Sequence, residues 1–388
     1  MSGKRKRRDF FYIAVGLTVS ALILALVLTL ILRPEKAYSS REKRMLAGFP
    51  AFNAESVKTG QFMDELEDYA KDQFAIRDAA ADLRSTLKLL MGDRESNGVL
   101  LLKNNRLAER FVMQDMKARE ALLNEVAAFS ERNTGARQVF LLAPTAIWLY
   151  ADEAPAFSEP GDEDVYIDLI YRMLPERMTK LDVRPTFLRE KDTTELYYRT
   201  DHHWTTEGAK IAAELLLKAL GITPELPTES GVVAASFMGT LASKSGFRSV
   251  PADAVTVYRV ESDPDAGFYF TVNYIDEQTM SASLYEAEAL ETDNPYDVFF
   301  GGNHAEIEIR TSRETYRRLL IIKDSYANAV IPFLVPHFDE ITVIDPRYYQ
   351  GNIDELTAEG EFTDIVFLYN ANTLSQDTSL EMVLRNDQ

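Results

Sequence analysis

Cysteine is absent from this chain of 388 residues. Its absence excludes disulfide bonds, thiolate metal sites and catalysis by a thiol nucleophile. Histidine is scarce, with four residues in the whole sequence. Any imidazole that acts as a base or a metal ligand must therefore come from one of these positions. Hydrophobic residues make up 46% and charged residues 27% of the chain, which is enough for a sizeable core in one large or two smaller domains.

Basic residues are few once the first 33 residues are set aside. The remainder holds 36 Lys and Arg against 60 Asp and Glu, a net charge of about −24. Such a surface repels a phosphate backbone, so nucleic acid is excluded as an expected partner. An exported domain without disulfides must rely on its own core, and a Gram-positive-type cell surface fits this composition.

A long uncharged run extends from Phe10 to Leu32. At ~1.5 Å per residue, a helix of this length crosses a hydrocarbon core of roughly 30 Å. The run is longer than the apolar part of a signal peptide, and no small-x-small cleavage site follows it, so we expect an uncleaved anchor. Five basic residues from Lys4 to Arg8 precede it, which predicts a cytoplasmic N-terminus in the cell membrane and an extracellular C-terminal domain.

These features predict four segments along the chain. Residues 1–9 form a cytoplasmic basic tail and residues 10–32 a transmembrane helix. Residues 33–60, with scattered proline and glycine, predict an irregular stalk, and residues 61–388 an extracytoplasmic domain. Within that domain, alternating stretches between about 225 and 300 predict a β-rich insertion that helps to shape a binding groove.

Short apolar runs predict buried strands, because each run is too short for a helix. They are Arg137–Pro144, Arg318–Lys323, Glu340–Ile344 and Asp364–Tyr369. Helical spacing of apolar residues occurs before and between them, at 61–90, 115–131, 166–174, 207–220 and briefly from 326. Strands that are apolar on both faces and alternate with helices predict an α/β fold with a parallel sheet flanked by helices.

Two adjacent histidines stand in the stretch YRTDHHWTTEGAK, and three interpretations are open. In the first, these residues only lead into a helix that Thr205 caps. In the second, Asp201 and His203 share one face of an extended segment, His202 points to the other, and the carboxylate holds His203 as a general base. In the third they bind a metal, with a remote ligand such as His304. Adjacent strand side chains point apart and helical His-x-x-x-His spacing is missing, so we predict no metal and no other cofactor.

A serine nucleophile has a suitable place in the stretch RLLIIKDSYANAVIPFL. Ser325 follows a predicted buried strand and precedes a short helical run. In an open α/β sheet this junction lies in the crevice that binds ligands, where a helix N-terminus and free backbone N–H groups stabilise a developing oxyanion. The structural alternative is that Ser325 only caps the helix.

Together the two stretches resemble the DHHW protein family, which carries the tetrapeptide found here at Asp201 to Trp204. That family is similar to the SGNH-hydrolase-like alginate O-acetyltransferases of bacterial envelopes. Further segments shared with it are EKRMLAGFPAF, FMGTLASKSG, FFGGNHAEI, KDSYANAVIPFLVPHFDEITVIDPRYY and FLYNANTL. The resemblance implies an SGNH-hydrolase-like fold and a catalytic triad of Ser325 as nucleophile, His203 as general base and Asp201 as its orienting carboxylate.

Oxyanion or substrate-binding candidates are the side chains of Asn370, after the last predicted strand, and Asn303, in a Gly-Gly-Asn-His stretch. Each also fits a plain turn residue. The N–H of Ser325 is a further candidate donor.

By this resemblance we expect a membrane-anchored serine O-acyltransferase that acetylates a cell-surface polysaccharide through an acyl-Ser325 intermediate. The related systems imply a multipass membrane O-acyltransferase partner that delivers the acyl group. An esterase with the same triad is an alternative. A carbohydrate-binding or envelope-assembly protein without catalysis, and a metal-dependent hydrolase, are others.

Overall fold

The computed structural model describes residues 2–39, 44–74, 76–114, 116–260, 262 and 267–385. The chain forms two compact units, which we call the N-terminal unit (Met1–Asp93 with Gly246–Arg248) and the main unit (Arg94–Ser245 with Ser249–Gln388). The main unit begins at Arg94, inside the segment 61–388 that the sequence predicts as the extracytoplasmic domain. Helix α4 (Arg77–Leu90) buries none of its residues, which is why it does not join the core of the main unit.

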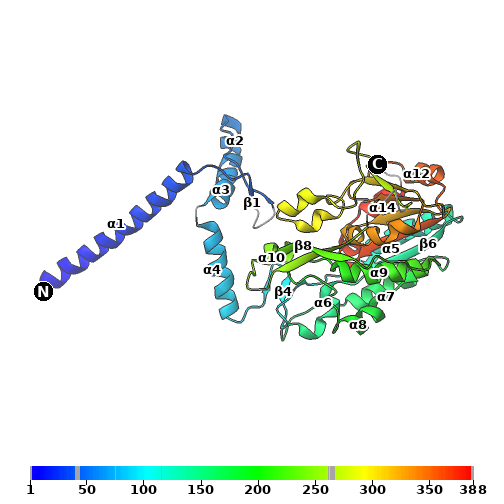
Figure 1. Cartoon of the computed structure of the whole chain (residues 1–388). Helices are drawn as coiled ribbons and strands as arrows, with labels where there is room; N and C mark the ends of the chain where they lie inside the picture. Colours follow the sequence, from blue (N-terminus) through cyan, green and yellow to red (C-terminus); the bar gives the residue numbers. More distant parts are fainter. Residues whose placement is uncertain are drawn as a thin grey trace. The chain divides into compact units, whose positions relative to one another are not determined.

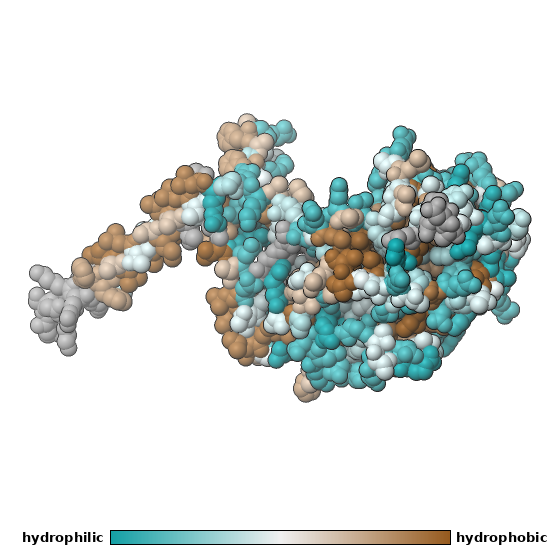
Figure 2. All heavy atoms as spheres, viewed as in Figure 1, coloured by the Kyte–Doolittle hydropathy of each residue, from teal (hydrophilic) through white to brown (hydrophobic). Residues whose placement is uncertain are grey.

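The N-terminal unit begins with helix α1 (Ser2–Leu32). Its segment Phe10–Leu30 is long and apolar enough to cross a membrane, and these properties fit an N-terminal signal sequence equally. Figure 2 shows the apolar side chains along this helix at the surface. The predicted stalk contains regular elements, because Asn53 caps a short helix through bonds to the N–H groups of Glu55 and Ser56. The other elements are β1 (Tyr38–Ser39), β2 (Arg44–Met45), α2 (Ala54–Thr59) and α3 (Gln61–Gln73).

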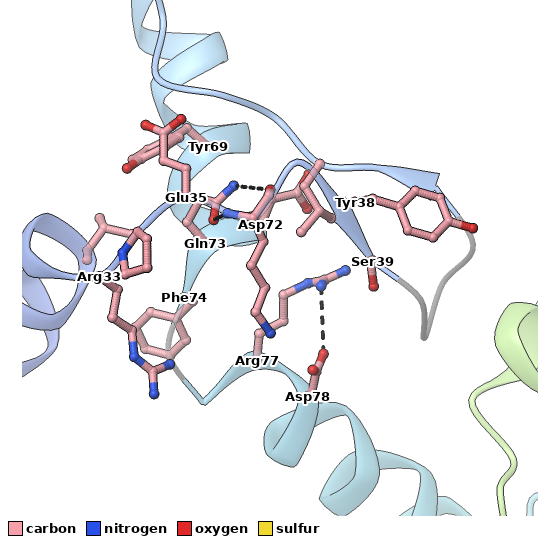
Figure 3. A pocket seen from close by; sticks show the side chains of 14 residues that line it. Arg33, Glu35, Tyr38, Ser39, Tyr69, Asp72, Gln73, Phe74, Arg77 and Asp78 are labelled. Atoms are coloured by element: carbon pink, nitrogen blue, oxygen red, sulfur yellow. Dashed lines mark hydrogen bonds and ion pairs between the residues drawn. The ribbon is translucent and has the colours of Figure 1, made fainter. Parts of the chain in front are cut away.

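A pocket of about 330 Å³ lies within this unit (Figure 3). The side chain of Gln73 bonds to both the N–H and the carbonyl of Lys36, at 3.0 Å each, and so fixes the chain that leaves α1. Asp72 accepts a bond from the Ala47 N–H at 2.9 Å and pairs with Arg44, whose hydrogen bonds hold the pKa of Asp72 at about 2. None of the candidate site residues lines this pocket.

The main unit contains an eight-stranded sheet in the order β11-β10-β12-β14-β13-β15-β6-β7. Four of its strands match the predicted apolar runs: β6 (Arg137–Ala143), β13 (Arg318–Lys323), β14 (Glu340–Ile344) and β15 (Asp364–Asn370). These four and β7 (Thr179–Leu181) pair in parallel, as expected. Apart from the partly exposed first residue of β6, β13 and β14, these four strands are buried, which explains their continuous apolar sequence.

At one side, antiparallel strands extend the predicted parallel sheet, so the whole sheet is mixed. Strand β12 (Glu306–Thr311) pairs antiparallel with β14. Strand β10 (Phe270–Tyr274) then pairs antiparallel with β12, and β11 (Thr279–Ser281) pairs antiparallel with β10. In β12, buried Ile307 and Ile309 alternate with more exposed glutamates, the pattern of a strand with one solvated face. Part of the predicted β-rich insertion thus extends the central sheet.

Helices cover the sheet in two groups (Figure 1). One group contains α5 (Met116–Arg132), α7 (Glu163–Met173), α13 (Ala371–Gln376) and α14 (Ser379–Arg385). The other contains α9 (Thr206–Ala219) and α11 (Ile331–Leu334), which contact each other. Thr205 caps α9 by accepting from the Gly208 N–H at 3.2 Å, and Gly221 ends it with φ 70°, as the sequence predicted. Shorter helices are α6 (Ala146–Leu149), α8 (Arg184–Glu190), α10 (Thr240–Ser245) and α12 (Ile353–Gly360).

Two small sheets complete the main unit. One comprises β3 (Glu95–Ser96), β4 (Val99–Leu101) and β5 (Leu107–Glu109), and the other is the pair β8 (Ser230–Phe237) and β9 (Asp253–Tyr258).

Chain direction across the sheet changes at β13. Strands β14 and β15 lie on opposite sides of β13, so the connections that follow β13 and β14 run in opposite directions. Such a switch point leaves a crevice at the carboxyl end of the strands, where open α/β sheets bind ligands. Ser325 follows β13 directly, and Asn370 ends β15, so both predicted residues lie at this edge.

Candidate active site

Ser325 begins a short 3₁₀ helix, η4 (Ser325–Ala329), directly after β13. The expected α-helical N-terminus is therefore replaced by a tighter turn, since Pro332 stands at the start of α11. Asp324 caps η4 by accepting from the Tyr326 N–H at 2.9 Å. The side chain of Ser325 is half-buried at the end of the strand.

The Oγ atom of Ser325 lies 2.8 Å from Nε2 of His203. The other ring nitrogen, Nδ1, lies 2.6 Å from Oδ1 of Asp201. An ionised carboxylate only accepts, so Nδ1 carries the proton and Nε2 has the lone pair that accepts the Ser325 O–H. The three residues form one continuous hydrogen-bonded chain in the tautomer that a general base requires. The predicted contact between His203 and Ser325 is confirmed, and the catalytic roles remain predictions.

Asp201 is fully buried and accepts four hydrogen bonds. Its Oδ1 receives the backbone N–H and Nδ1 of His203, and its Oδ2 receives the N–H and hydroxyl of Thr240 at 2.8 and 2.9 Å. Burial alone raises the pKa of a carboxyl, but the neighbouring His202 and His203 and these bonds outweigh it. The pKa of Asp201 lies well below its ordinary value, so the group is ionised when it faces His203.

A glycine lets the backbone approach Asp201. A Cβ at Gly239 would lie 2.3 Å from Cβ and 2.6 Å from Oδ2 of Asp201, well inside van der Waals contact. The close approach brings Thr240, the next residue, onto the carboxylate. The surrounding stretch FMGTLASKSG belongs to the resemblance to the DHHW family, but no local sequence pattern connects it with Asp201.

Tyr296 was also missed by the sequence analysis. Its ring stacks on His203 with centroids 3.8 Å apart and planes at 11°, and its hydroxyl donates to the carbonyl of Ser325 at 3.2 Å. An aromatic face against an imidazole limits its rotation and favours the imidazolium form. Trp204 is fully buried, as expected, and its Nε1–H donates to the carbonyl of Tyr326 at 3.0 Å.

His202 does not point away from His203, so the prediction from strand alternation is wrong here. Residues 201–203 form a bend, and the two imidazole rings lie 3.8 Å apart with planes at 37°. Nδ1 of His202 lies 2.7 Å from the hydroxyl of Thr240. The Tyr326 hydroxyl donates to the carbonyl of His202 and fixes this bend.

The residues Asp201, His202 and His203 could together hold a metal ion, since one ligand atom from each lies within 4.8 Å of the others. The geometry fits a triad better, because both nitrogens of His203 already have partners in Asp201 and Ser325. His304, the suggested remote ligand, instead bonds through its ring nitrogens to Glu277 and to the carbonyl of Phe300.

The two asparagine candidates have other contacts. Both N–H groups of the Asn370 amide are used, one on Oδ2 of Asp324 at 2.6 Å and the other on the hydroxyl of Thr373 at 2.7 Å. Asn370 thereby holds the carboxylate that caps η4. The amide oxygen of Asn303 accepts from Lys323 Nζ at 2.9 Å and from Asn328 Nδ2 at 3.2 Å. Their roles as oxyanion donors stay predictions.

The best-placed oxyanion donor is the backbone N–H of Ser325. Within the part of the chain that the structure describes, no acceptor bonds to it. It begins η4, where the first N–H groups have no partner inside the helix. When an acyl group is bonded to Oγ of Ser325 in a tetrahedral intermediate, the oxyanion of that group lies within reach of the Ser325 N–H.

Part of the main unit matches the model of a known protein family. Residues 100–267 match the family model of the SGNH hydrolase-like domain of the acetyltransferase AlgX. The main unit has an SGNH hydrolase-like fold. The matched range includes Asp201 and His203 and ends before Ser325, which the structure places beside them. The match supports an enzyme of the O-acetyltransferase or esterase class, as expected from the resemblance.

Solved structures share this SGNH hydrolase-like fold. A DHHW family protein from Eubacterium siraeum has a TM-score of 0.61 and 21% identity, over 75% of this chain and 96% of the other. PatB1 from Bacillus cereus has a TM-score of 0.60 and 17% identity, over 72% of this chain and 98% of the PatB1 chain. The structure of PatB1 with a sulfonyl adduct has a TM-score of 0.59 and 17% identity, over 74% of this chain and 97% of the PatB1 chain. No curated protein matches the sequence.

Proposed function

We propose that this protein is a membrane-anchored, extracytoplasmic serine O-acyltransferase that acetylates hydroxyls of a cell-surface polysaccharide through an acyl-Ser325 intermediate. The observation that carries the proposal is the unbroken chain of hydrogen bonds from Asp201 through His203 to Ser325. The family match to an acetyltransferase domain supports acyl transfer as the reaction. The apolar segment Phe10–Leu30 of α1 and the basic residues before that segment support the anchor and its orientation.

In the first half-reaction, Oγ of Ser325 attacks the carbonyl carbon of the acyl donor. His203 Nε2 takes the hydroxyl proton, and Asp201 stabilises the imidazolium that forms. The N–H of Ser325 stabilises the tetrahedral oxyanion. The bond to the leaving group then breaks, and His203 returns its proton to that group, which leaves the acyl ester on Ser325.

In the second half-reaction, a sugar hydroxyl attacks the acyl carbonyl. His203 takes the proton of this hydroxyl, the ester bond to Ser325 breaks, and the proton passes to Oγ of Ser325. Water in place of the sugar would give an esterase with the same residues. The acetyl donor must reach the outside of the cell without coenzyme A, so we propose a multipass membrane O-acyltransferase as the partner that supplies it.

The test uses the full chain in detergent micelles with p-nitrophenyl acetate, a chelator and neutral oligosaccharides. We expect release of nitrophenol, one acetyl group on Ser325 by mass spectrometry, and acetylated sugar. Ser325→Ala should lower turnover by about 10³-fold or more, to the background that binding alone supports. Ser158→Ala is the matched control, because the Ser158 hydroxyl only donates to the Pro155 carbonyl in a loop.

Each other outcome points to a different class of protein. Acetate without acetylated sugar would indicate an esterase. Equal rates in wild type and Ser325→Ala would show that Ser325 is not the nucleophile and would favour a carbohydrate-binding protein without catalysis.

A further inference from the structure

A pocket of about 280 Å³ opens beside the triad. Three of its wall residues are direct neighbours of triad residues: His202 precedes His203, Tyr326 follows Ser325, and Thr240 bonds to Asp201. The remaining wall is mostly polar and uncharged, apart from the ion pair of Lys244 with Glu109. The other lining residues are Thr145, Ala146, Leu241, Asn370, Asn372, Thr373 and Gln376.

The hydrogen bonds of Thr240 determine the tautomer of His202. A hydroxyl has one proton to donate, and the Asp201 carboxylate, 2.9 Å from Thr240 Oγ1, only accepts. The Thr240 proton therefore lies on the bond to Asp201, where the negative charge strengthens it. Nδ1 of His202, 2.7 Å from the same oxygen, must then be the donor. This leaves the lone pair of His202 on Nε2.

That lone pair is available to a ligand. The side chain of His202 is 34% exposed, and no described residue bonds to its Nε2. Burial, followed by the neighbouring His203, lowers the pKa of His202 to about 4, so the His202 ring is neutral near pH 7. The backbone of His202 is held by the Tyr326 hydroxyl and its Nδ1 by Thr240, so the acceptor atom is fixed in place.

His203 presents a second Nε2 lone pair in a ring stacked 3.8 Å from that of His202. A substrate that donates hydrogen bonds to both rings needs two hydroxyls close together. Hydroxyls on neighbouring carbons of a sugar ring meet this requirement, and a neutral polar wall suits an uncharged sugar.

We propose that the pocket binds the acyl acceptor as a vicinal diol of an uncharged sugar residue, with one hydroxyl on His203 Nε2 and its neighbour on His202 Nε2. The first hydroxyl attacks the acyl-Ser325 carbonyl as described above, and its proton goes to His203. The second hydroxyl keeps its proton and only orients the ring. This inference rests on the proposed acyl-Ser325 intermediate, and His202 is a residue that binds the acceptor in the second half-reaction.

The experiment separates the two half-reactions in the full chain. Nitrophenol release in a single turnover reports acylation of Ser325, and product analysis reports partition of the acetyl group between water and added acceptor. Vicinal cyclohexanediol and cyclohexanol form the matched acceptor pair, followed by neutral glucose oligosaccharides. We expect wild type to prefer the diol roughly three- to tenfold per hydroxyl, the effect of one net hydrogen bond.

Two variants test the residue. His202→Asn keeps a donor for Thr240 but cannot reach the second hydroxyl, so the diol preference should fall to that for cyclohexanol, whatever the rate at which the variant is acylated. His202→Gln places an amide oxygen near the position of Nε2 and should restore part of the preference. Thermal unfolding of each variant monitors the fold.

The outcomes distinguish the inference from the function on which it rests. Normal acylation of wild type without a diol preference overturns the inference alone, as does an unchanged preference in His202→Asn. Equal loss of acylation and transfer in a folded His202→Asn would mean that His202 only positions the triad, and would overturn it too. Absence of an acetyl group on Ser325 in wild type overturns both proposals.

Discussion

His203 and Ser325 are separated by 122 residues in the chain, yet Nε2 of the one lies 2.8 Å from Oγ of the other. The contact joins the bend before α9 to the carboxyl end of β13. Two further bonds connect the same segments, from Trp204 to the carbonyl of Tyr326 and from the Tyr326 hydroxyl to the carbonyl of His202. The buried aromatic residues of both motifs thus hold the reacting atoms together.

Replacement of Asp201 by Asn should lower turnover of p-nitrophenyl acetate by up to about 10⁴-fold, the loss seen when an orienting carboxylate in a triad becomes an amide. The amide can donate to Nδ1, which moves the proton of His203 to Nε2 and leaves no lone pair for Ser325. The rate is measured by nitrophenol release. A loss below tenfold in a folded variant would contradict this role.

Gly239→Ala should reduce both stability and turnover, because the new methyl group would lie 2.3 Å from Cβ of Asp201. Overpacking of this kind costs about 1–3 kcal/mol. Gly231→Ala is the matched control, since no atom lies within 4 Å of a Cβ at that position. Denaturant unfolding and nitrophenol release measure the two effects. Equal behaviour of the two variants would show that the backbone near Asp201 can adjust.

Tyr296→Phe should retain most of the turnover, whereas Tyr296→Leu should lose roughly two- to thirtyfold. Phenylalanine keeps the ring stacked on His203 and loses only the 3.2 Å bond to the Ser325 carbonyl. Leucine removes the aromatic face, which contributes about 0.5–2 kcal/mol to a cation beside it. The ratio of the two rates is the measurement, and a larger loss in Tyr296→Phe would assign the effect to the hydroxyl instead.

Because of Glu163, the wild-type protein should be less stable at neutral than at acidic pH. The Glu163→Gln variant should lack this pH dependence. This carboxyl is 2% exposed, and burial raises its pKa from 4.5 to about 7, although bonds from the N–H and hydroxyl of Thr145 oppose the shift. The folded state therefore binds more protons than the unfolded state between these values, and stability falls as pH rises through that window.

The size of this effect is on the order of 3 kcal/mol above pH 7, from a rise of the pKa from 4.5 to about 7. Glutamine resembles the protonated side chain and has no such titration. The free energy of unfolding of both proteins, measured from pH 4 to pH 8, should diverge across the window. Parallel curves would mean that Glu163 ionises freely in the fold.

Turnover should be unchanged after removal of divalent metals, because Asp201 and Ser325 already occupy both ring nitrogens of His203. The rate is compared before and after dialysis against a chelator. Loss of activity that added Zn²⁺ restores would support a metal-dependent hydrolase at the same residues.

The parallel strands of the sheet could be predicted from sequence, since β13 and β14 have short, mainly apolar interiors next to charged residues. The mixed character of the sheet could not, because β10 and β12 are short alternating strands whose partners, β12 and β14, are distant in sequence. Whether a strand pairs parallel or antiparallel depends on such distant contacts.

Asp201 and His203 could be paired from sequence, although the reason given for their contact was wrong. A bend brings them together, and this bend also brings His202 beside His203. The sequence around Gly239, Thr240 and Tyr296 does not show that these residues support the triad, because both of their segments are distant in sequence from Asp201 and His203. A single sequence contains their residue types but not their distances.

Strand order also has a consequence for how the domain folds. Strand β6 pairs with β15, so Val139 can reach its native pairing only after Val366 has been synthesised. A sheet whose central contacts are so distant in sequence folds slowly and leaves apolar strand edges unpaired during synthesis. A chain that stops before β15 would leave β6 and β13 each without one of its two neighbouring strands, and we expect such a fragment to aggregate.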